Sequence, residues 1–148
     1  MIKIVRASSG HLEDLAPLFN AYRIFYGQAS DVEASLLFLK ERIEKEQSVV
    51  LMAKIEESFV GFTQLFTTYS SVSLQPYYIL NDLYVKPKFR GQRIGSRLLD
   101  AAKQLCCDMD FKGLALETAV DNPAQELYER LGWLKDTEYF HYFWKNHK

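Results

Sequence analysis

Cysteine, net charge and long apolar runs are all scarce in this sequence, and each shortage excludes a class of protein. The two cysteines, Cys106 and Cys107, are adjacent, so neither a disulfide framework nor a zinc cluster can be read from their spacing. The 18 Lys and Arg residues nearly balance the 19 Asp and Glu residues, whereas a protein that binds nucleic acid through its phosphates is normally basic. No run reaches the roughly 18 apolar residues that span a bilayer, and no signal peptide is visible. We therefore expect a cytoplasmic protein with neither a nucleic-acid nor a membrane partner.

The composition that remains is that of an ordinary folded domain. Apolar residues make up 48% of the 148 residues and charged residues 25%, close to the averages for globular proteins. A chain of this length buries a full hydrophobic core, and we expect one domain over residues 1–148. The aromatic content of 14% is high and favours a core rich in β-sheet.

The spacing of the apolar residues predicts strands and helices in a definite order. A first strand is followed by two helices, of which the first ends near Gly27 and the second begins with the capping-box pattern Ser30-x-x-Glu33. A third helix is expected from Ile94, and a short fourth helix after Asn122-Pro123. Strands are expected at residues 2–6, 49–53, 59–69, 77–85, 113–120 and 138–145. This order predicts a mixed α/β fold, with a meander of strands first and βα units later.

The segment Arg90–Ser96 lies between a predicted strand and a predicted helix and has the features of an anion-binding turn. The first turn of a helix has unpaired N–H groups and the positive end of the helix dipole. Gly91 and Gly95 would let the main chain approach phosphate groups closely. The alternative is an ordinary turn in which the two glycines serve only the path of the chain.

Two motifs in the sequence resemble those of the GNAT family of N-acetyltransferases. Its acetyl-CoA-binding motif, Q/R-x-x-G-x-G/A, is matched by Arg90 at the first position and Gly95 at the last, while Arg93 replaces the middle glycine. Its second signature, N-x-x-A-x-x-x-Y-x-x-x-G-F/W, is similar to Asn122–Trp133. The resemblance implies an α/β GNAT fold with a mixed central sheet of about six to seven strands and about four helices, splayed between the fourth and fifth strands.

The resemblance further implies transfer of an acetyl group from acetyl-CoA to a primary amine, with the co-substrate held largely by main-chain groups. Leu83 and Val85 would pair with the pantetheine arm, and amides of the turn would hold the pyrophosphate. Asn122 would lie near the arm, although a role as helix N-cap explains it equally well. The residues expected to bind acetyl-CoA are Leu83, Tyr84, Val85, Arg90, Gly91, Gln92, Arg93, Ile94, Gly95, Ser96 and Asn122.

Direct transfer requires a base for the amine and an acid for the departing thiolate. By the resemblance Glu117 is the first candidate base and Asp82 the second, and Tyr128 is the candidate acid; Asn81 is a candidate for orienting the substrate or a water. The alternatives are an outward charge for Glu117 and core packing for Tyr128. The three histidines have no spacing that suggests a catalytic triad or a metal site, and we expect no metal.

The acceptor amine is left open by the sequence. The segments 22–30 and 70–78, rich in tyrosine and including the candidate substrate residue Tyr26, suit a small cationic or aromatic amine. Protein N-termini and lysines are the alternative acceptors, and a non-catalytic acyl-CoA-binding domain or an interaction module built on the aromatic tail are the alternative functions. A homodimer is expected because dimers are common in the family.

Overall fold

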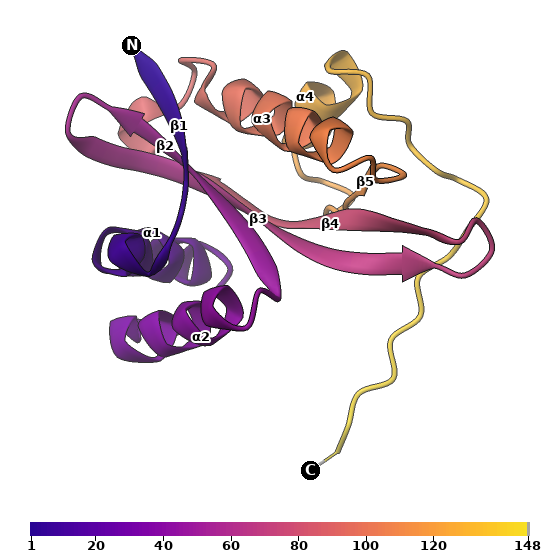
Figure 1. Cartoon of the computed structure of the whole chain (residues 1–148), viewed down its shortest axis with the longest axis horizontal. Helices are drawn as coiled ribbons and strands as arrows, with labels where there is room; N and C mark the ends of the chain where they lie inside the picture. The colour runs from indigo at the N-terminus through magenta and orange to yellow at the C-terminus, as the bar shows by residue number, and fades with distance from the viewer. Residues whose placement is uncertain (148) are drawn as a thin grey trace. The chain divides into compact units, whose positions relative to one another are not determined.

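The computed structural model describes residues 1–147, and residue contacts divide the chain into two compact units. The first unit is Met1–Glu117 and the second begins at Thr118. The expectation of one domain over residues 1–148 stays a prediction. In the first unit, α1 and α2 lie on one face of a β-sheet and α3 lies on the other (Figure 1).

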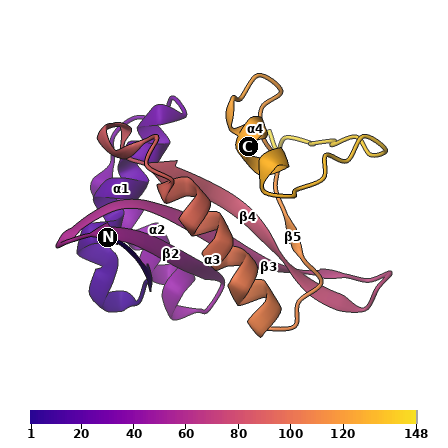
Figure 2. The same ribbon diagram turned by 90° about the horizontal axis from the view of Figure 1, so that it is seen from above.

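The sheet has five strands in the order β1-β2-β3-β4-β5. The first four strands pair antiparallel, and β5 pairs parallel with β4, so the sheet is mixed as predicted. The predicted hairpin between β2 and β3 is confirmed, and the long twisted pair of β3 and β4 is seen in Figure 2. The strands are β1 (Ile2–Arg6), β2 (Ser48–Ile55), β3 (Ser58–Ser70), β4 (Gln75–Val85) and β5 (Leu114–Ala115).

The helices of the first unit begin and end close to the predicted positions. They are α1 (Leu12–Phe25), α2 (Val32–Glu44) and α3 (Ile94–Asp108), with short 3₁₀ helices at Ser9–His11 and Pro87–Phe89. Gly27 follows α1 with a φ of 85°, a left-handed conformation that suits glycine and ends the helix. Within residues 1–147 no helix is both long and apolar enough to cross a membrane.

Helices on both faces explain why the central strand β2 is buried throughout its first six residues. Its side chains Val50 and Met52 join Leu15, Leu39 and Phe62 in the core between the sheet and the pair α1 and α2. On the other face, α3 buries Ile94, Leu98, Leu99, Ala102 and Cys106. Cys106 is therefore a small core residue, whereas Cys107 is exposed.

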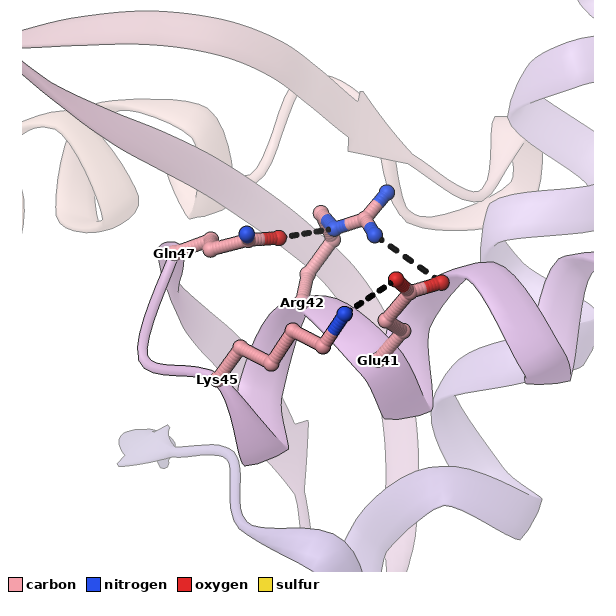
Figure 3. A network of polar contacts seen from close by, with 4 residues as sticks. All are labelled: Glu41, Arg42, Lys45 and Gln47. Atoms are coloured by element: carbon pink, nitrogen blue, oxygen red, sulfur yellow. Dashed lines mark hydrogen bonds and ion pairs between the residues drawn. The ribbon is translucent and has the colours of Figure 1, made fainter.

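Both ends of α2 are held by side chains. The predicted capping box at Ser30 is wrong, because Asp31 is the N-cap and its carboxylate accepts from the N–H of Ala34 at 3.0 Å. At the other end Arg42 Nε donates to Gln47 Oε1 at 2.7 Å, and Glu41 contacts both Arg42 and Lys45 (Figure 3). Lys45 first, and then Arg42, holds the pKa of Glu41 below its usual range. Because these ion pairs are exposed, they add little to stability at the end of α2.

The predicted strand count of about six to seven is wrong, because two predicted strands differ from the structure. The strand expected at residues 113–120 is reduced to the two residues of β5, and residues 138–145 form no strand. Alternating aromatic residues favour a strand only where a partner strand and a buried face are present. The side chains of Tyr139, Phe140, Tyr142, Phe143 and Trp144 are all at least 78% exposed, so that face is missing here.

The second unit contains α4 (Ala124–Arg130), the predicted short helix. Asn122 Oδ1 accepts from the N–H of Ala124 at 2.9 Å, which is the capping role that the sequence suggested, although the residue directly before the helix is Pro123. Gly132, with a φ of 90°, follows the helix at the predicted end.

Candidate functional site

Strand β4 contains a bulge that turns part of its main chain away from the rest of the sheet. Gln64 of β3 pairs with Asp82 whereas Leu65 pairs with Leu80, so Asn81 is an extra residue in β4. Before the bulge, the N–H of Tyr78 donates to Gly113 next to β5 at 3.0 Å. One extra residue reverses the alternation of the main-chain groups along the strand.

A hydrogen bond just after β4 shows how the main chain is oriented beyond the bulge. Lys86 N–H donates to the carbonyl of Val60 in β3 at 2.8 Å, so the polar groups of Lys86 face β3. Because neighbouring residues of a strand alternate, the N–H and C=O groups of Val85 and Leu83 face the opposite edge. Strand β5 pairs only with Tyr78 and Ile79, so within residues 1–147 no strand covers that edge. The predicted residues Leu83 and Val85 thus present main-chain hydrogen-bonding groups at an open strand edge.

The turn before α3 combines left-handed backbone with an uncapped helix start. Gly91 has a φ of 79° and Arg93 a φ of 66°, so Arg93 adopts the conformation for which glycine is favoured. The replacement of the middle glycine of the motif therefore leaves the left-handed backbone in place. Among residues 1–147 no side chain caps α3 at Arg93, and the first turn of the helix contains no acidic residue. Such an end suits an anion, because its N–H groups and the helix dipole both favour negative charge.

Arg90 links this turn to the open edge of β4. Its Nε donates to the carbonyl of Val85 at 2.9 Å. Its guanidinium carbon lies 5.5 Å from the centroid of the Phe25 ring and 5.7 Å from that of Tyr84, which is the range of cation–π contact. An exposed cation is thus held where the strand edge meets the turn.

The other candidate acetyl-CoA residues differ in which atoms they expose. The side chains of Tyr84 and Ile94 are buried in the core, and by the same alternation the main-chain groups of Tyr84 face β3. Gln92 is exposed in the turn, and Gly95 and Ser96 are half-buried in the first turn of α3.

The candidate base Asp82 lies in a buried polar cluster next to the bulge. Its side chain is only 4% exposed. Gln64 Nε2 donates to Oδ2 at 2.6 Å, and Asn81 Nδ2 donates to Oδ1 at 3.0 Å. Burial raises the pKa of Asp82, while hydrogen bonds from Gln64, Tyr22 and Asn81 act in the opposite direction. The group is a carboxyl with a raised pKa that is held by donors and has no cation among its partners, an arrangement common at functional sites.

Tyr22 brings α1 to the same cluster. Its hydroxyl donates to the carbonyl of Asn81 at 3.4 Å, and its ring centroid lies 4.9 Å from that of Tyr26, the predicted substrate residue. Tyr26 is 56% exposed, so the aromatic rings run from the surface to the buried carboxyl. Tyr78, which belongs to the other segment suggested for acceptor binding, is buried against Phe111 and is a core residue instead.

Gln64 was missed by the sequence analysis. It lies within a run of apolar, β-branched and aromatic residues that predicts a strand, and this pattern assigns no separate role to the glutamine. A glutamine in a buried strand is itself a signal, because side chains of this kind are mostly exposed.

The other candidate catalytic residues, Glu117 and Tyr128, belong to different units of the chain. Glu117 is exposed at the end of the first unit. Tyr128 lies on α4 in the second unit, where its ring centroid is 5.9 Å from that of Trp133. Their catalytic roles, and that of Asn122 beside the co-substrate, stay predictions.

Other parts of the described chain offer weaker evidence of a ligand site. A shallow pocket at the start of β5 is lined by Ser70, Tyr77, Lys112, Gly113, Leu114 and Ala115. In the part of the chain that the structure describes, no group of three or more His, Cys, Asp or Glu residues is arranged to hold a metal ion. His11 is engaged locally, since its Nδ1 accepts from the N–H of Ser8 at 3.0 Å.

Comparison with known proteins agrees with this arrangement. The model of the Acetyltransferase (GNAT) family matches residues 12–133. The chain is 46% identical over 142 residues to the "Uncharacterized N-acetyltransferase YhfO" of Bacillus subtilis (strain 168), covering 95% of each chain. A crystal structure of a "probable acetyltransferase" superposes with a TM-score of 0.92 at 39% identity, covering 99% of each chain. The chain therefore belongs to the GNAT family, has its fold, and is an N-acetyltransferase.

A more distant structure adds information on the fold alone. An aminoglycoside N-acetyltransferase in complex with CoA superposes with a TM-score of 0.81 at 20% identity, covering 98% of this chain and 95% of that one.

Proposed function

We propose that the protein transfers the acetyl group of acetyl-CoA directly to a primary amine of a small molecule. The observation that carries the proposal is the open edge of β4 at Leu83 and Val85, which adjoins the uncapped start of α3. An amide-containing arm pairs with a free strand edge, and phosphates suit a helix N-terminus. The distant relative solved with CoA supports the same co-substrate.

The residues present fit acetyl-CoA. Main-chain groups of Leu83 and Val85 would hold the pantetheine arm, and amides of Gly91, Arg93 and Gly95 would hold the pyrophosphate, with Arg90 adding a positive charge. No acidic residue stands in the first turn of α3 to repel the phosphates. Acetyl-CoA supplies a thioester, whose acyl carbon is attacked by the amine and whose thiolate leaves.

The amine must lose a proton to attack. A primary ammonium group has a pKa of about 10.4, so holding it neutral at pH 7 costs about 4–5 kcal/mol. We propose Asp82 as the group that receives this proton, in preference to Glu117, because Asp82 is buried and its raised pKa brings it closer to neutral pH. Gln64 and Asn81 occupy part of the carboxylate, which leaves acceptor capacity for the amine or for one bridging water.

The departing thiolate takes a proton in turn. Tyr128 is the proposed donor, on the match of its position to the second family signature. A thiol with a pKa of about 8.5 and a tyrosine with a pKa of about 10 differ by only about 2 kcal/mol, so this transfer is affordable. The N–C bond forms and the C–S bond breaks. The ammonium group loses one proton to Asp82 before attack and a second one to solvent after the N–C bond has formed, while the thiolate takes the proton of Tyr128. Asp82 then releases its proton to solvent. Tyr128 then regains a proton from solvent.

The acceptor proposed is a small cationic or aromatic amine. The support is the run of rings at Phe25, Tyr26 and Tyr22 that leads to the buried carboxyl of Asp82. Protein N-termini and lysine side chains remain the second candidates. The homodimer and the cytoplasmic location stay predictions from the family resemblance.

A screen of amines with acetyl-CoA, read by release of the CoA thiol, tests the proposal. Polyamines, aminoglycosides, amino acids and short peptides are compared, and the Gly95→Glu variant serves as a control because it places a negative side chain at the phosphate site. We expect turnover on at least one small amine, and loss of CoA binding by calorimetry in Gly95→Glu but not in Gly95→Ala. Turnover only on peptides would transfer the function to the second candidate, and unchanged CoA affinity in Gly95→Glu would refute the site.

A further inference from the structure

The cluster around Asp82 contains one residue that the proposed chemistry has not used. Gln64 is 1% exposed on β3, between the buried core residues Phe62 and Leu65. Its Nε2 donates to the Asp82 carboxylate at 2.6 Å, whereas its Oε1 is buried and has no hydrogen-bond partner within residues 1–147. Burying an amide with one atom unpaired is unfavourable, and an apolar side chain would fill the same space without that cost. The amide is therefore explained by the carboxylate it contacts rather than by packing.

Two neighbouring residues of β3 hold Asp82 in different ways. Gln64 contacts the carboxylate, while the hydroxyl of Thr63 donates to the main-chain carbonyl of Asp82 at 2.7 Å. Both residues are fully buried and both lie beside the bulge. The first contact acts on the charge of Asp82, and the second acts only on the path of its backbone.

We propose that Gln64 is a positioning residue for acetyl transfer, whose side-chain amide orients the Asp82 carboxylate at the bulge and keeps it ionised in spite of its burial. The proposal rests on the proposed function, in which Asp82 receives the proton of the amine. An ionised carboxylate is the form that can accept this proton, and a buried one stays ionised only when donors replace the water it has lost.

The groups that face the carboxyl come from three elements. Gln64 from β3 and Asn81 from β4 donate to it, the Tyr22 hydroxyl from α1 lowers its pKa, and within residues 1–147 no cation acts on it. Of the three, Gln64 is the most deeply buried, and its contact of 2.6 Å with the carboxylate is shorter than the 3.0 Å contact of Asn81. Removal of this donor therefore leaves the charge on Asp82 less stabilised, and the proton is bound more tightly.

The decisive experiment compares Gln64→Leu with the matched control Thr63→Val. The carboxyl carbon of Asp82 is followed by ¹³C NMR as pH is varied, in the protein alone, and its signal is identified by its loss in Asp82→Asn. We expect the titration midpoint to rise by about one to two pH units in Gln64→Leu, because a hydrogen bond to a charged group is lost. In Thr63→Val the midpoint stays at the wild-type value, although the protein loses a buried hydrogen bond of the same kind.

The same variants are then compared in acetyl transfer. The acidic limb of kcat/KM against pH, measured on an amine identified by the thiol-release screen, shifts upward in Gln64→Leu by the same amount as the NMR midpoint. Gln64→Glu keeps the shape of the side chain and places a second carboxyl beside Asp82, so it also shifts the midpoint and the acidic limb upward. This variant replaces Gln64→Leu if Gln64→Leu does not fold.

The outcomes separate this proposal from the proposed function. An unchanged midpoint in the Gln64 variants, or an equal shift in Thr63→Val, overturns it. A shifted midpoint with an unshifted rate profile overturns its role in transfer, since Asp82 is then not the proton acceptor. Failure of the wild-type protein to acetylate any amine overturns the proposed function, while the NMR titration still decides whether Gln64 keeps Asp82 ionised.

Discussion

Arg90 and Val85 are joined by a hydrogen bond of 2.9 Å from the guanidinium Nε to the main-chain carbonyl. That carbonyl faces the edge of β4 that turns away from β3, and the guanidinium lies over the Phe25 and Tyr84 rings. One side chain thus connects the strand edge, the end of α1 and the turn before α3. The positive charge is held in place before any ligand arrives.

We predict that Arg90→Ala weakens the binding of CoA by about tenfold or more, because a charge-assisted hydrogen bond to phosphate contributes about 1.5–3 kcal/mol. Isothermal titration calorimetry measures the effect. Lys88→Ala is the matched control, since Lys88 is an exposed cation in the same segment. An equal loss of affinity in the two variants would mean that only net charge matters, and not the position of Arg90.

Tyr128→Phe removes a hydroxyl and keeps the ring that contacts Trp133. If Tyr128 protonates the thiolate, kcat falls by about 10²–10⁴ with the affinity for CoA nearly unchanged. Steady-state kinetics and calorimetry check the two parts. Tyr139→Phe removes a hydroxyl from an exposed ring and leaves kcat at the wild-type value. Wild-type turnover in Tyr128→Phe would assign Tyr128 to packing.

The two candidate bases are distinguished by the pH dependence of their variants. For wild-type protein we predict that kcat/KM rises with pH through the pKa of Asp82, which burial holds above its usual range, since the ionised form accepts the proton. In Asp82→Asn the loss of rate is greatest at neutral pH and is partly rescued as pH approaches the pKa of the amine, about 10.

Glu117→Gln is the comparison variant, and its ratio to wild type is expected to be constant with pH. Rescue at high pH in Glu117→Gln but not in Asp82→Asn would return the role to Glu117. Constant ratios in both variants from about pH 6.5 to 9.5 would mean that neither carboxylate is the base and that a water chain carries the proton.

The raised pKa of Asp82 also predicts how stability depends on pH. The folded protein binds the proton of Asp82 more tightly than the unfolded chain does, so this proton stabilises the folded state. Its contribution to the free energy of unfolding is fully present below the usual pKa of about 3.9 and is lost as pH rises through the raised pKa of the folded state. Each unit of upward shift corresponds to about 1.4 kcal/mol. Asp82→Asn abolishes this titration.

Urea denaturation from about pH 4 to 8 measures the difference between the two proteins. We expect the free energy of unfolding of Asp82→Asn, relative to wild type, to increase with pH over this range. A difference that does not vary with pH would show that the pKa of Asp82 is the same in the folded and unfolded states.

Much of the fold was predicted correctly where the signal is local. The helix from Ile94, the stop at Gly27 and the β2–β3 hairpin depend on residues that are neighbours in the chain, and each is confirmed. The cap of α2 was assigned one residue too early, because Ser30 and Asp31 are both good N-caps and the choice between them depends on the path of the chain. In the structure Ser30 Oγ instead accepts from Asn20 Nδ2 at 3.1 Å.

The sequence by itself determined the family, and it predicted an anion-binding turn at Arg90–Ser96 and the candidate side chains for proton transfer, because these follow from residue types at fixed spacing. Only the tertiary structure decided that Asn81 is an extra residue in β4, that Gln64 and Tyr22 meet Asp82, and that residues 138–145 lack a strand partner. A bulge depends on the register of two strands, and the pKa of Asp82 depends on burial by residues up to 60 positions away, such as Tyr22. Pairing and burial between distant segments leave no periodic pattern in the chain, so they are decided when the segments pack together.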